Sequence, residues 1–176
     1  SNEKKTAHKL YKTIVKQARK PVFYEQYGVS DTFDCRFDMI SLHMILVMRR
    51  LKSDNDKTHE LSQALFDFMF DDFDLNLREL GIGDMGVLKR VKKMAQAFYG
   101  RLHSYDEALD KNDVVQLSKA LKRNLYRGLN VSKSNLQTMT SYTLKQSEHL
   151  DKCKISSLIS GNLEFYSVTN HLTKIN

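Results

Sequence analysis

The sequence has little of what strand-rich and secreted proteins need. One proline and seven glycines among 176 residues provide few turn positions, so the composition favours long helices over many short strands. The only cysteines, Cys35 and Cys153, show no C-x-x-C pair and no metal-ligand spacing, which indicates a reducing compartment. The longest apolar run, residues 39–48, is too short to cross a bilayer, which needs about 20 residues.

A starting methionine and a secretory signal are also missing. We therefore interpret Ser1 and Asn2 as residues left by cloning. Hydrophobic residues make up 41% of the chain and charged residues 28%, which is ordinary for a soluble globular protein. No linker or repeat interrupts the sequence, so we expect residues 1–176 to form a single domain.

The net charge of +7 is unevenly distributed. Residues 1–20 hold seven Lys or Arg against one acid, and residues 53–84 hold nine acids against two cations. Residues 85–101 hold five cations and no acid. Such blocks favour attraction to an acidic partner, a membrane surface or RNA. Alternatively, the acidic and basic blocks face each other inside one bundle.

Hydrophobic periodicity predicts an all-α, single-domain bundle of about six to seven helices. The expected helices are residues 4–20, 31–52, 58–80, 85–111, 112–128, 132–150 and 153–160, and residues 163–168 are expected to be extended. The helix at 31–52 is apolar nearly all round, so we expect it at the centre of the bundle. Asp31 and Thr58 are the expected caps of their helices.

The first helix and the central helix each leave an alternative open. The helix at 4–20 has an apolar stripe and a lysine-rich face, a pattern that suits either packing on its own domain or lying on a membrane. On the central helix, His43, Met44 and Met48 can in principle ligate haem iron. A lone histidine in an apolar helix is more often a hydrogen-bonded core residue, and we favour that role.

Gly81, Gly83 and Gly86 spell G-x-G-x-x-G, a pattern that holds a pyrophosphate when it follows a strand and opens a helix. Here the pattern follows a predicted helix, and Asp84 puts a carboxylate where the phosphate would lie. We therefore interpret Gly81 as the left-handed cap that ends one helix and Asp84 as the N-cap of the next.

A second candidate for chemistry is the acidic ridge of Asp67, Asp71 and Asp74. Paired carboxylates can transfer protons, but a solvated or salt-bridged ridge is the simpler interpretation. The sequence has no H-E-x-x-H or G-x-S-x-G motif, and its six histidines show no metal-ligand spacing. We predict a protein that is not an enzyme and that uses no cofactor and no metal.

The helix at 85–111 carries the main candidate for a binding surface. Its cations and small residues lie opposite or beside the apolar stripe that centres on Phe98: Lys89, Arg90, Lys92, Lys93, Ala97, Gly100 and Arg101. Glycine inside a helix costs about 1 kcal/mol relative to alanine, so we expect another backbone to approach Gly100 closely. Either a helix of the same domain fills this notch, or an anionic peptide, a lipid head group or an RNA backbone does.

Several blocks of the chain resemble the ubiquinol–cytochrome c chaperone family, and its bacterial members in particular. The blocks are FDCRFDMISLHMILVMRRL at 33–51, LSQALFDFMFDDFDLNLRELGIGDMGVLKRVKKMAQAFYGRLHSYDEAL at 61–109, LKRNLYRG at 121–128 and, less closely, ISSLISGNLEF at 155–165. The resemblance is close over residues 25–128. The polar stretch at 132–151 departs from the family's pattern.

This resemblance implies an all-helical chaperone that assists assembly of the respiratory cytochrome bc complex. Mitochondrial relatives act with a small partner protein, bind near the ribosomal exit tunnel and then hold newly made cytochrome b. The implied partners are cytochrome b or another subunit of the complex, the ribosome or its RNA, and a membrane surface. The implied location is the bacterial cytoplasm, at the cytoplasmic face of the inner membrane, or the mitochondrial matrix in a eukaryote.

Such a chaperone needs exposed apolar area for its client and charge for docking. We expect Met69, Phe70 and Phe73 to supply the apolar area and the cations of the helix at 85–111 to supply the charge. The rival interpretation is an RNA-binding or ribosome-binding helical module, whose affinity should fall steeply with added salt.

Overall fold

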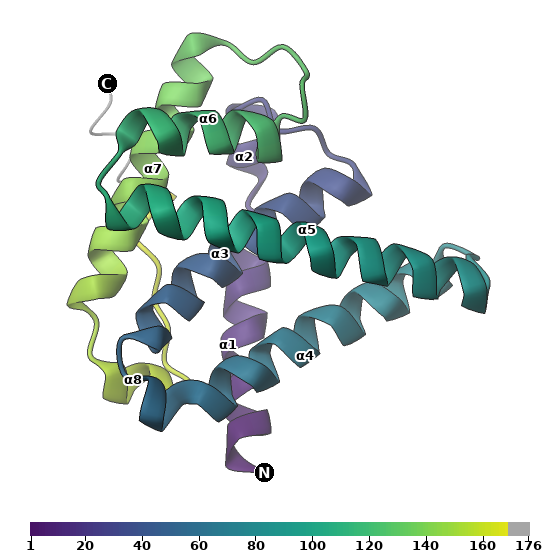
Figure 1. The fold of residues 1–176 in the computed structure, drawn as a ribbon, viewed down its shortest axis with the longest axis vertical. Helices are drawn as coiled ribbons and strands as arrows, with labels where there is room; N and C mark the ends of the chain where they lie inside the picture. Colours follow the sequence, from purple (N-terminus) through teal and green to yellow (C-terminus); the bar gives the residue numbers. More distant parts are fainter. Residues whose placement is uncertain (169–176) are drawn as a thin grey trace.

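The computed structural model describes residues 1–168, which form six long helices and two short ones (Figure 1). The long helices are α1 (Asn2–Ala18), α3 (Phe33–Lys52), α4 (Asn55–Glu79), α5 (Asp84–Asp110), α6 (Val114–Leu125) and α7 (Lys133–Lys152), and the short ones are α2 (Pro21–Glu25) and α8 (Ile155–Ile159). No strand occurs within residues 1–168, and the predicted all-α class is confirmed. Only α2 was not predicted; Pro21 opens it as a first helical residue.

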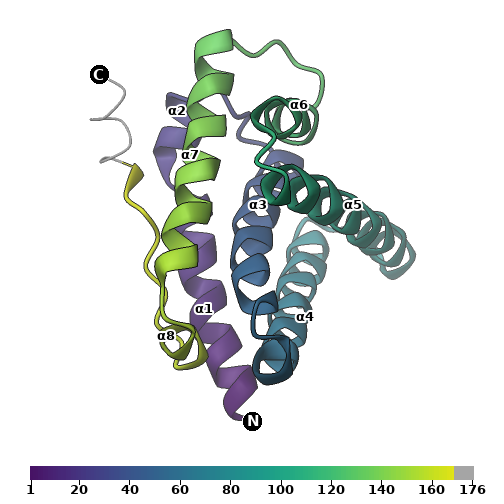
Figure 2. The same cartoon turned by 60° about the vertical axis from the view of Figure 1, so that its left-hand side comes forward.

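Helix α3 lies at the centre of the bundle, as its composition predicted. It contacts α1, α4, α5, α6, α7 and α8, and every residue from Phe37 to Val47 is buried. Figure 2 shows α1 and α7 on one side of α3, with α4 and α5 on the other. Burying a large apolar side chain contributes about 1.5–3 kcal/mol, so α3 is a major source of the stability of this fold.

The basic first helix packs along the acidic fourth helix. The contact between α1 and α4 is the most extensive one between helices, and Tyr11 donates a 2.7 Å hydrogen bond to Asp72 across it. The apolar stripe of α1, with Leu10 and Ile14, is fully buried. The lysine-rich helix therefore packs on its own domain, and two of the charge blocks do lie side by side.

The glycines between α4 and α5 form a turn, as predicted. Gly81 has a φ of 84°, its amide donates to the Arg78 carbonyl at 2.9 Å, and the Ile82 amide donates to Leu77 at 3.2 Å. This is the hydrogen-bond pattern of a Schellman cap. Gly83, not Asp84, is the N-cap of α5, because Gly83 has the extended backbone of a capping residue.

Two other predicted caps are displaced. Thr32 caps α3 by accepting a hydrogen bond from the Cys35 amide, because the Asp31 carboxylate pairs instead with Arg36 at 2.7 Å. Helix α4 begins at Asn55, three residues before Thr58, whose hydroxyl donates to the carbonyl of Leu51. Short polar side chains compete for such local bonds, and sequence alone does not rank them.

The chain after α8 is irregular. Residues 162–167 form neither helix nor strand. The side chain of Gln146 on α7 pairs with both the carbonyl and the amide of Tyr166, at 2.6 and 2.9 Å. Side-chain bonds of this kind replace the sheet ladder that an extended segment would otherwise need.

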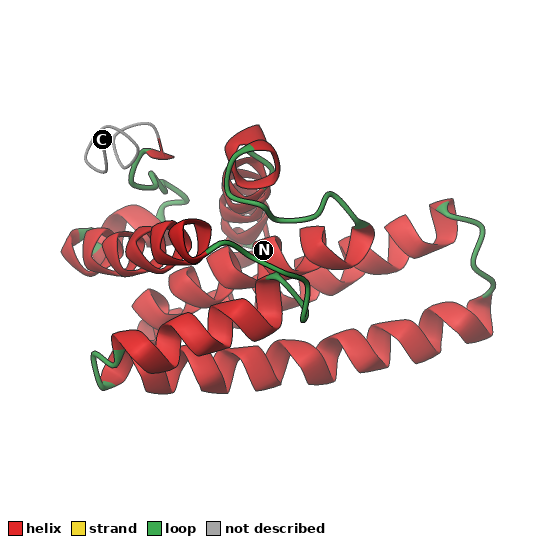
Figure 3. Cartoon of the chain, turned by 90° about the horizontal axis from the view of Figure 1, so that it is seen from above, coloured by secondary structure: helices red, strands yellow, loops and turns green. Residues whose placement is uncertain are grey.

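Helices α4 and α5 form a hairpin whose closed end projects from the bundle (Figures 1 and 3). We call residues 75–93 the hairpin arm. Leu80, Met85 and Leu88 on this arm are 63%, 73% and 68% exposed. Within residues 1–168, no helix has the length and hydropathy that crossing a membrane requires.

Candidate partner-binding site

The apolar residues predicted to face a client lie inside the bundle. Met69, Phe70 and Phe73 of α4 are all buried. Phe73 packs edge-on against Phe37 of α3 at 5.1 Å, and Phe70 packs against Phe98 of α5 at 6.2 Å. Helix α4 carries two apolar stripes because it lies between other helices. The prediction that these three residues expose apolar area is therefore wrong.

The predicted cations at the start of α5 are exposed. Lys89, Arg90, Lys92 and Lys93, which we call the cationic strip, make no ion pair and no side-chain hydrogen bond within residues 1–168. They belong to the projecting hairpin arm, and none of them pairs with Asp72, the acid of α4 that bonds to α1. The cationic strip is thus a local surplus of positive charge.

Part of the strip borders a hollow of about 330 Å³ between α5 and the start of α3. Besides the predicted Arg90, Lys93 and Ala97, its lining residues are Phe33, Asp34, Phe37, Met94 and Arg127. The hollow therefore combines apolar and aromatic side chains with cations. It does not include Lys89, Lys92 or Gly100.

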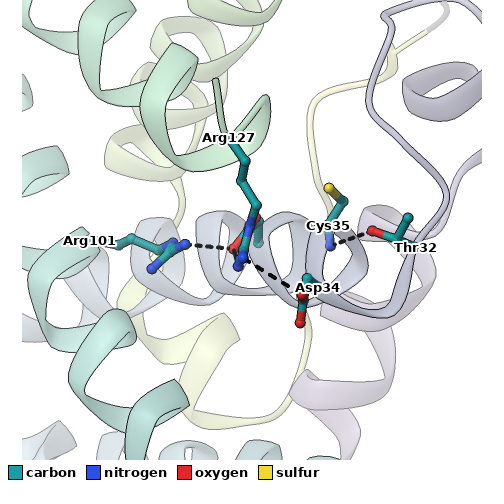
Figure 4. A network of polar contacts seen from close by, with 6 residues as sticks. Thr32, Asp34, Cys35, Arg101 and Arg127 are labelled. Carbon is teal, nitrogen blue, oxygen red and sulfur yellow. Dashed lines mark hydrogen bonds and ion pairs between the residues drawn. The ribbon is translucent and has the colours of Figure 1, made fainter. Parts of the chain in front are cut away.

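Beside this hollow lies a buried ionic network (Figure 4). The fully buried Asp38 carboxylate accepts hydrogen bonds from Arg101 at 2.8 Å and from Arg127 at 2.6 and 3.0 Å. Burial raises the pKa of Asp38, while the hydrogen bond from Arg127 and the charges of Arg101 and Arg127 oppose that rise. Arg101 of α5 and Arg127, which follows α6, thus hold one carboxylate of α3.

This network corrects the prediction for Arg101. Its side chain is only 11% exposed, and its guanidinium lies 5.6 Å from the centre of the Phe37 ring. Arg101 ties α5 to α3, so it is not an open surface cation as expected. The pairing was not predicted because Asp38 and Arg101 are far apart in the sequence.

Gly100 does not form the predicted notch. A Cβ atom added at Gly100 would meet nothing within 4 Å, and the residue is exposed. No backbone within residues 1–168 approaches it, because it lies on the solvent side of α5. The prediction of a close contact at Gly100 is therefore wrong.

His43 has the core role that we favoured. Its Nδ1 donates to the carbonyl of Met39 at 2.8 Å, and its Nε2 accepts from the hydroxyl of Tyr142 at 2.8 Å. Burial lowers the pKa of His43 to about 4, so the ring is neutral near neutral pH. Both ring nitrogens are engaged, which leaves none for haem iron. Within residues 1–168, no group of three or more His, Cys, Asp or Glu side chains is arranged to bind a metal.

Sequence reasoning missed Asp38, Arg127 and Phe33. One signal was available for Asp38, since it is the single acid inside the apolar part of the central helix. A buried carboxylate requires cations close by. Arg127 follows α6 with a φ of 47°, an uncommon value for a residue other than glycine, and no sequence pattern indicates this conformation.

Comparison with known proteins assigns this chain to a family. The family model described as ubiquinol–cytochrome C chaperone matches residues 25–165. The chain belongs to the ubiquinol–cytochrome c chaperone family. The match continues past residue 128 and through the polar stretch at 132–151. Family membership also confirms the prediction of a chaperone rather than an enzyme.

Solved and curated relatives agree with this membership. The crystal structure of the Cbp3 homologue from Brucella abortus matches with a TM-score of 0.85 and 38% identity, over 96% of this chain and 92% of that one. The ubiquinol–cytochrome-c reductase complex assembly factor 1 of Xenopus laevis is 24% identical over 145 residues, 82% of this chain and 72% of the relative. The Mus musculus protein of that name is 24% identical over 153 residues, 87% of this chain and 52% of the relative. The chain therefore spans between half and three quarters of these curated relatives.

Proposed function

We propose that this member of the ubiquinol–cytochrome c chaperone family promotes assembly of the respiratory cytochrome bc complex. In this proposal it binds cytochrome b or the machinery that translates it. Family membership and the names of the curated relatives, which are assembly factors of that complex, support the proposal. The observation that carries the docking part is the cationic strip of α5.

The strip suits docking because its charge is not used within residues 1–168. Residues 85–101 contain no acid, and the four cations of the strip have no ion-pair partner in that part of the chain. A surplus of one sign attracts a partner of the opposite sign and raises the rate of association. Arg90 and Lys93 also border the hollow with Phe37, so an anionic partner can gain apolar contact there.

The end of the hairpin arm can supply the apolar area that a membrane-protein client needs. Leu80, Met85 and Leu88 are exposed there, close in sequence to the cationic strip. Clustered exposed apolar side chains are typical of interaction sites. The arm replaces Met69, Phe70 and Phe73 as the proposed client contact. The proposed setting is the cytoplasmic face of a bacterial inner membrane, or the mitochondrial matrix in a eukaryote.

Charge reversal of the strip tests the proposal. The variant K89E/R90E/K93E is expected to lower the amount of assembled cytochrome bc complex in cells about tenfold, as a loss of about 1.4 kcal/mol in binding would do. Assembly is measured by native electrophoresis and by the haem b absorption of membranes. Thermal unfolding of the purified variant checks that the fold is intact.

The matched control reverses three lysines of α1. Lys5, Lys12 and Lys16 are exposed and make no ion pair within residues 1–168. The variant K5E/K12E/K16E changes the net charge by the same amount, and because α1 packs along the acidic α4, thermal unfolding must show that its fold is intact. With the fold intact, it is expected to leave assembly unchanged. Equal assembly in both triple variants and in the wild type would contradict docking through the strip.

The same unpaired cations favour a second candidate, an RNA-binding module. Four phosphate contacts to single-stranded RNA predict that log affinity falls with log salt at a slope of about −3. RNA binding with that slope, abolished in K89E/R90E/K93E and accompanied by no association with cytochrome b, would favour this candidate over the chaperone of cytochrome b.

A further inference from the structure

A second surface, on α6 and α7, joins an apolar groove to a cationic hollow. The groove measures about 550 Å³, and its apolar lining comes from Val114, Val115, Leu136 and Leu144. The hollow measures about 590 Å³. Its cations are Arg101, Lys119, Lys122, Arg123 and Arg127. Lys119 and Lys122 line both, so the two form one continuous surface.

Two apolar residues of the groove, Val114 and Val115, do not pack against the hydrophobic core of the fold. The buried face of α6 consists of Leu117, Ala120, Leu121 and Leu125. Val115 lies outside that set and is 64% exposed, and the neighbouring Val114 is 51% exposed. Such β-branched residues at the start of a surface helix offer apolar area to another molecule.

The spacing of the lining residues matches the shape of a helix. On α7, Leu136, Thr140 and Leu144 follow each other at four-residue intervals, and they form one ridge along the groove. On α6, Val115, Lys119 and Lys122 form the facing ridge. Two such ridges accept the side chains of a third helix between them. Eight residues of α7 extend about 12 Å, so the groove accommodates roughly two turns.

The positive charge beside the groove indicates that a helix bound there carries negative charge. Lys119, Lys122 and Arg123 are exposed and make no ion pair within residues 1–168, and no acidic side chain lines the groove or the hollow. Arg101 and Arg127 share the buried Asp38 carboxylate beneath them. Residues 169–176 contain Lys174 and no acid, so they do not supply the negative charge that this surface attracts.

We propose that the α6–α7 surface binds an acidic amphipathic helix of a partner protein. The apolar stripe of that helix lies in the groove, and its carboxylates pair with Lys119, Lys122 and Arg123. Binding of an amphipathic helix in a groove is a common mode of peptide recognition. The surface shares Arg101 of α5 with the helix of the cationic strip but contains none of the strip's four cations, so the proposal does not rest on the proposed function.

Fluorescence anisotropy with a synthetic helical peptide tests the proposal. The probe has 14 residues, leucines spaced three and four apart, and glutamates along one flank; its charge-inverted twin carries lysines there. The full chain is expected to bind the acidic peptide with a Kd of about 10 µM and the twin at least tenfold more weakly. The variants V115E and K119E/K122E should each weaken binding of the acidic peptide about tenfold.

The control variant is L129E, because Leu129 is exposed but lines neither the groove nor the hollow. It is expected to bind the acidic peptide as the wild type does. Equal affinity for both peptides, no measurable binding, or unchanged binding by V115E and K119E/K122E would overturn the proposal. The proposal would also be overturned if the chain did not bind the peptide but sedimented with phosphatidylglycerol vesicles, and if V115E abolished that sedimentation. The occupant of the groove would then be a lipid.

Discussion

Asp38 and His43 in the middle of α3 are bonded to other residues of the protein, whereas the four cations in the first half of α5 are not paired within residues 1–168. On α3, the buried Asp38 accepts three hydrogen bonds from arginines, and both nitrogens of the buried His43 are bonded. On α5, the four cations of the strip have no ion pair within residues 1–168. Polar groups of α3 therefore hold helices together, whereas those of the arm remain available to a partner.

Helix α5 changes along its length from cations that are unpaired within residues 1–168 to charged residues that are paired with α3. Lys93 lies in the exposed strip, and Arg101, about two turns later, is committed to Asp38. Near the end of α5, Asp106 and Asp110 both pair with Arg49 of α3 at 2.9 Å. The second half of α5 thus anchors the helix, and this anchoring lets the first half project from the bundle.

The largest expected effect comes from removing the buried carboxylate. Asp38→Ala leaves the nearly buried Arg101 without a counter-charge, which should lower the free energy of unfolding by about 3–5 kcal/mol. Urea denaturation measures this loss. Asp67→Ala, which removes an exposed acid of α4, should change stability by less than about 0.5 kcal/mol. Equal losses of unfolding free energy in Asp38→Ala and Asp67→Ala would contradict the claim that buried charges stabilise the fold and exposed charges do not.

A smaller effect is expected from the protonation of His43. Its pKa is about 4 in the folded protein and about 6.5 in the unfolded chain. Between pH 6.5 and pH 4 the unfolded chain therefore binds a proton at His43 that the folded protein does not bind. The stability of the folded protein is consequently not reduced by this proton above pH 6.5. It should decline by up to about 3 kcal/mol as the pH falls to 4. Denaturation at several pH values should show a slope in this window that His43→Gln reduces; identical slopes would contradict this account.

The smallest expected effect is at Gly100. Gly100→Ala should stabilise the protein by about 0.5–1 kcal/mol, because the new methyl group meets no neighbour and alanine favours the helix. Thermal unfolding measures the gain. Gly161→Ala is the opposite case, since Gly161 has a φ of 85° and a Cβ there would lie 2.9 Å from Lys9 Cδ, so it should destabilise. If Gly100→Ala instead lowered stability, the result would support the close backbone contact at Gly100 that the sequence predicted.

The fold was largely predictable because it depends on local periodicity. The central position of α3, whose middle is apolar nearly all round, and the Gly81 turn follow directly from residue patterns. The apolar surface was not predictable in the same way, because the two stripes of α4 suit either burial or exposure. Whether a stripe such as that of Phe70 and Phe73 is covered depends on neighbours in space.

The binding site was predicted only in part for a related reason. Arg90, Lys93 and Ala97 lie on one helix, so a single pattern groups them, and they do border one hollow. Phe33 and Arg127 complete that hollow from distant parts of the chain, and local sequence does not relate them to α5. Likewise, the burial of Arg101 depends on Asp38 of another helix.

The central claim is that the unpaired cations of the arm carry docking. Affinity capture of the tagged chain from cells that make the cytochrome bc complex tests it most directly, with cytochrome b and ribosomal RNA quantified in the captured material. The wild type and K5E/K12E/K16E should retain at least one of the two, and K89E/R90E/K93E should lose it about tenfold. Undiminished capture of both by K89E/R90E/K93E would contradict the account.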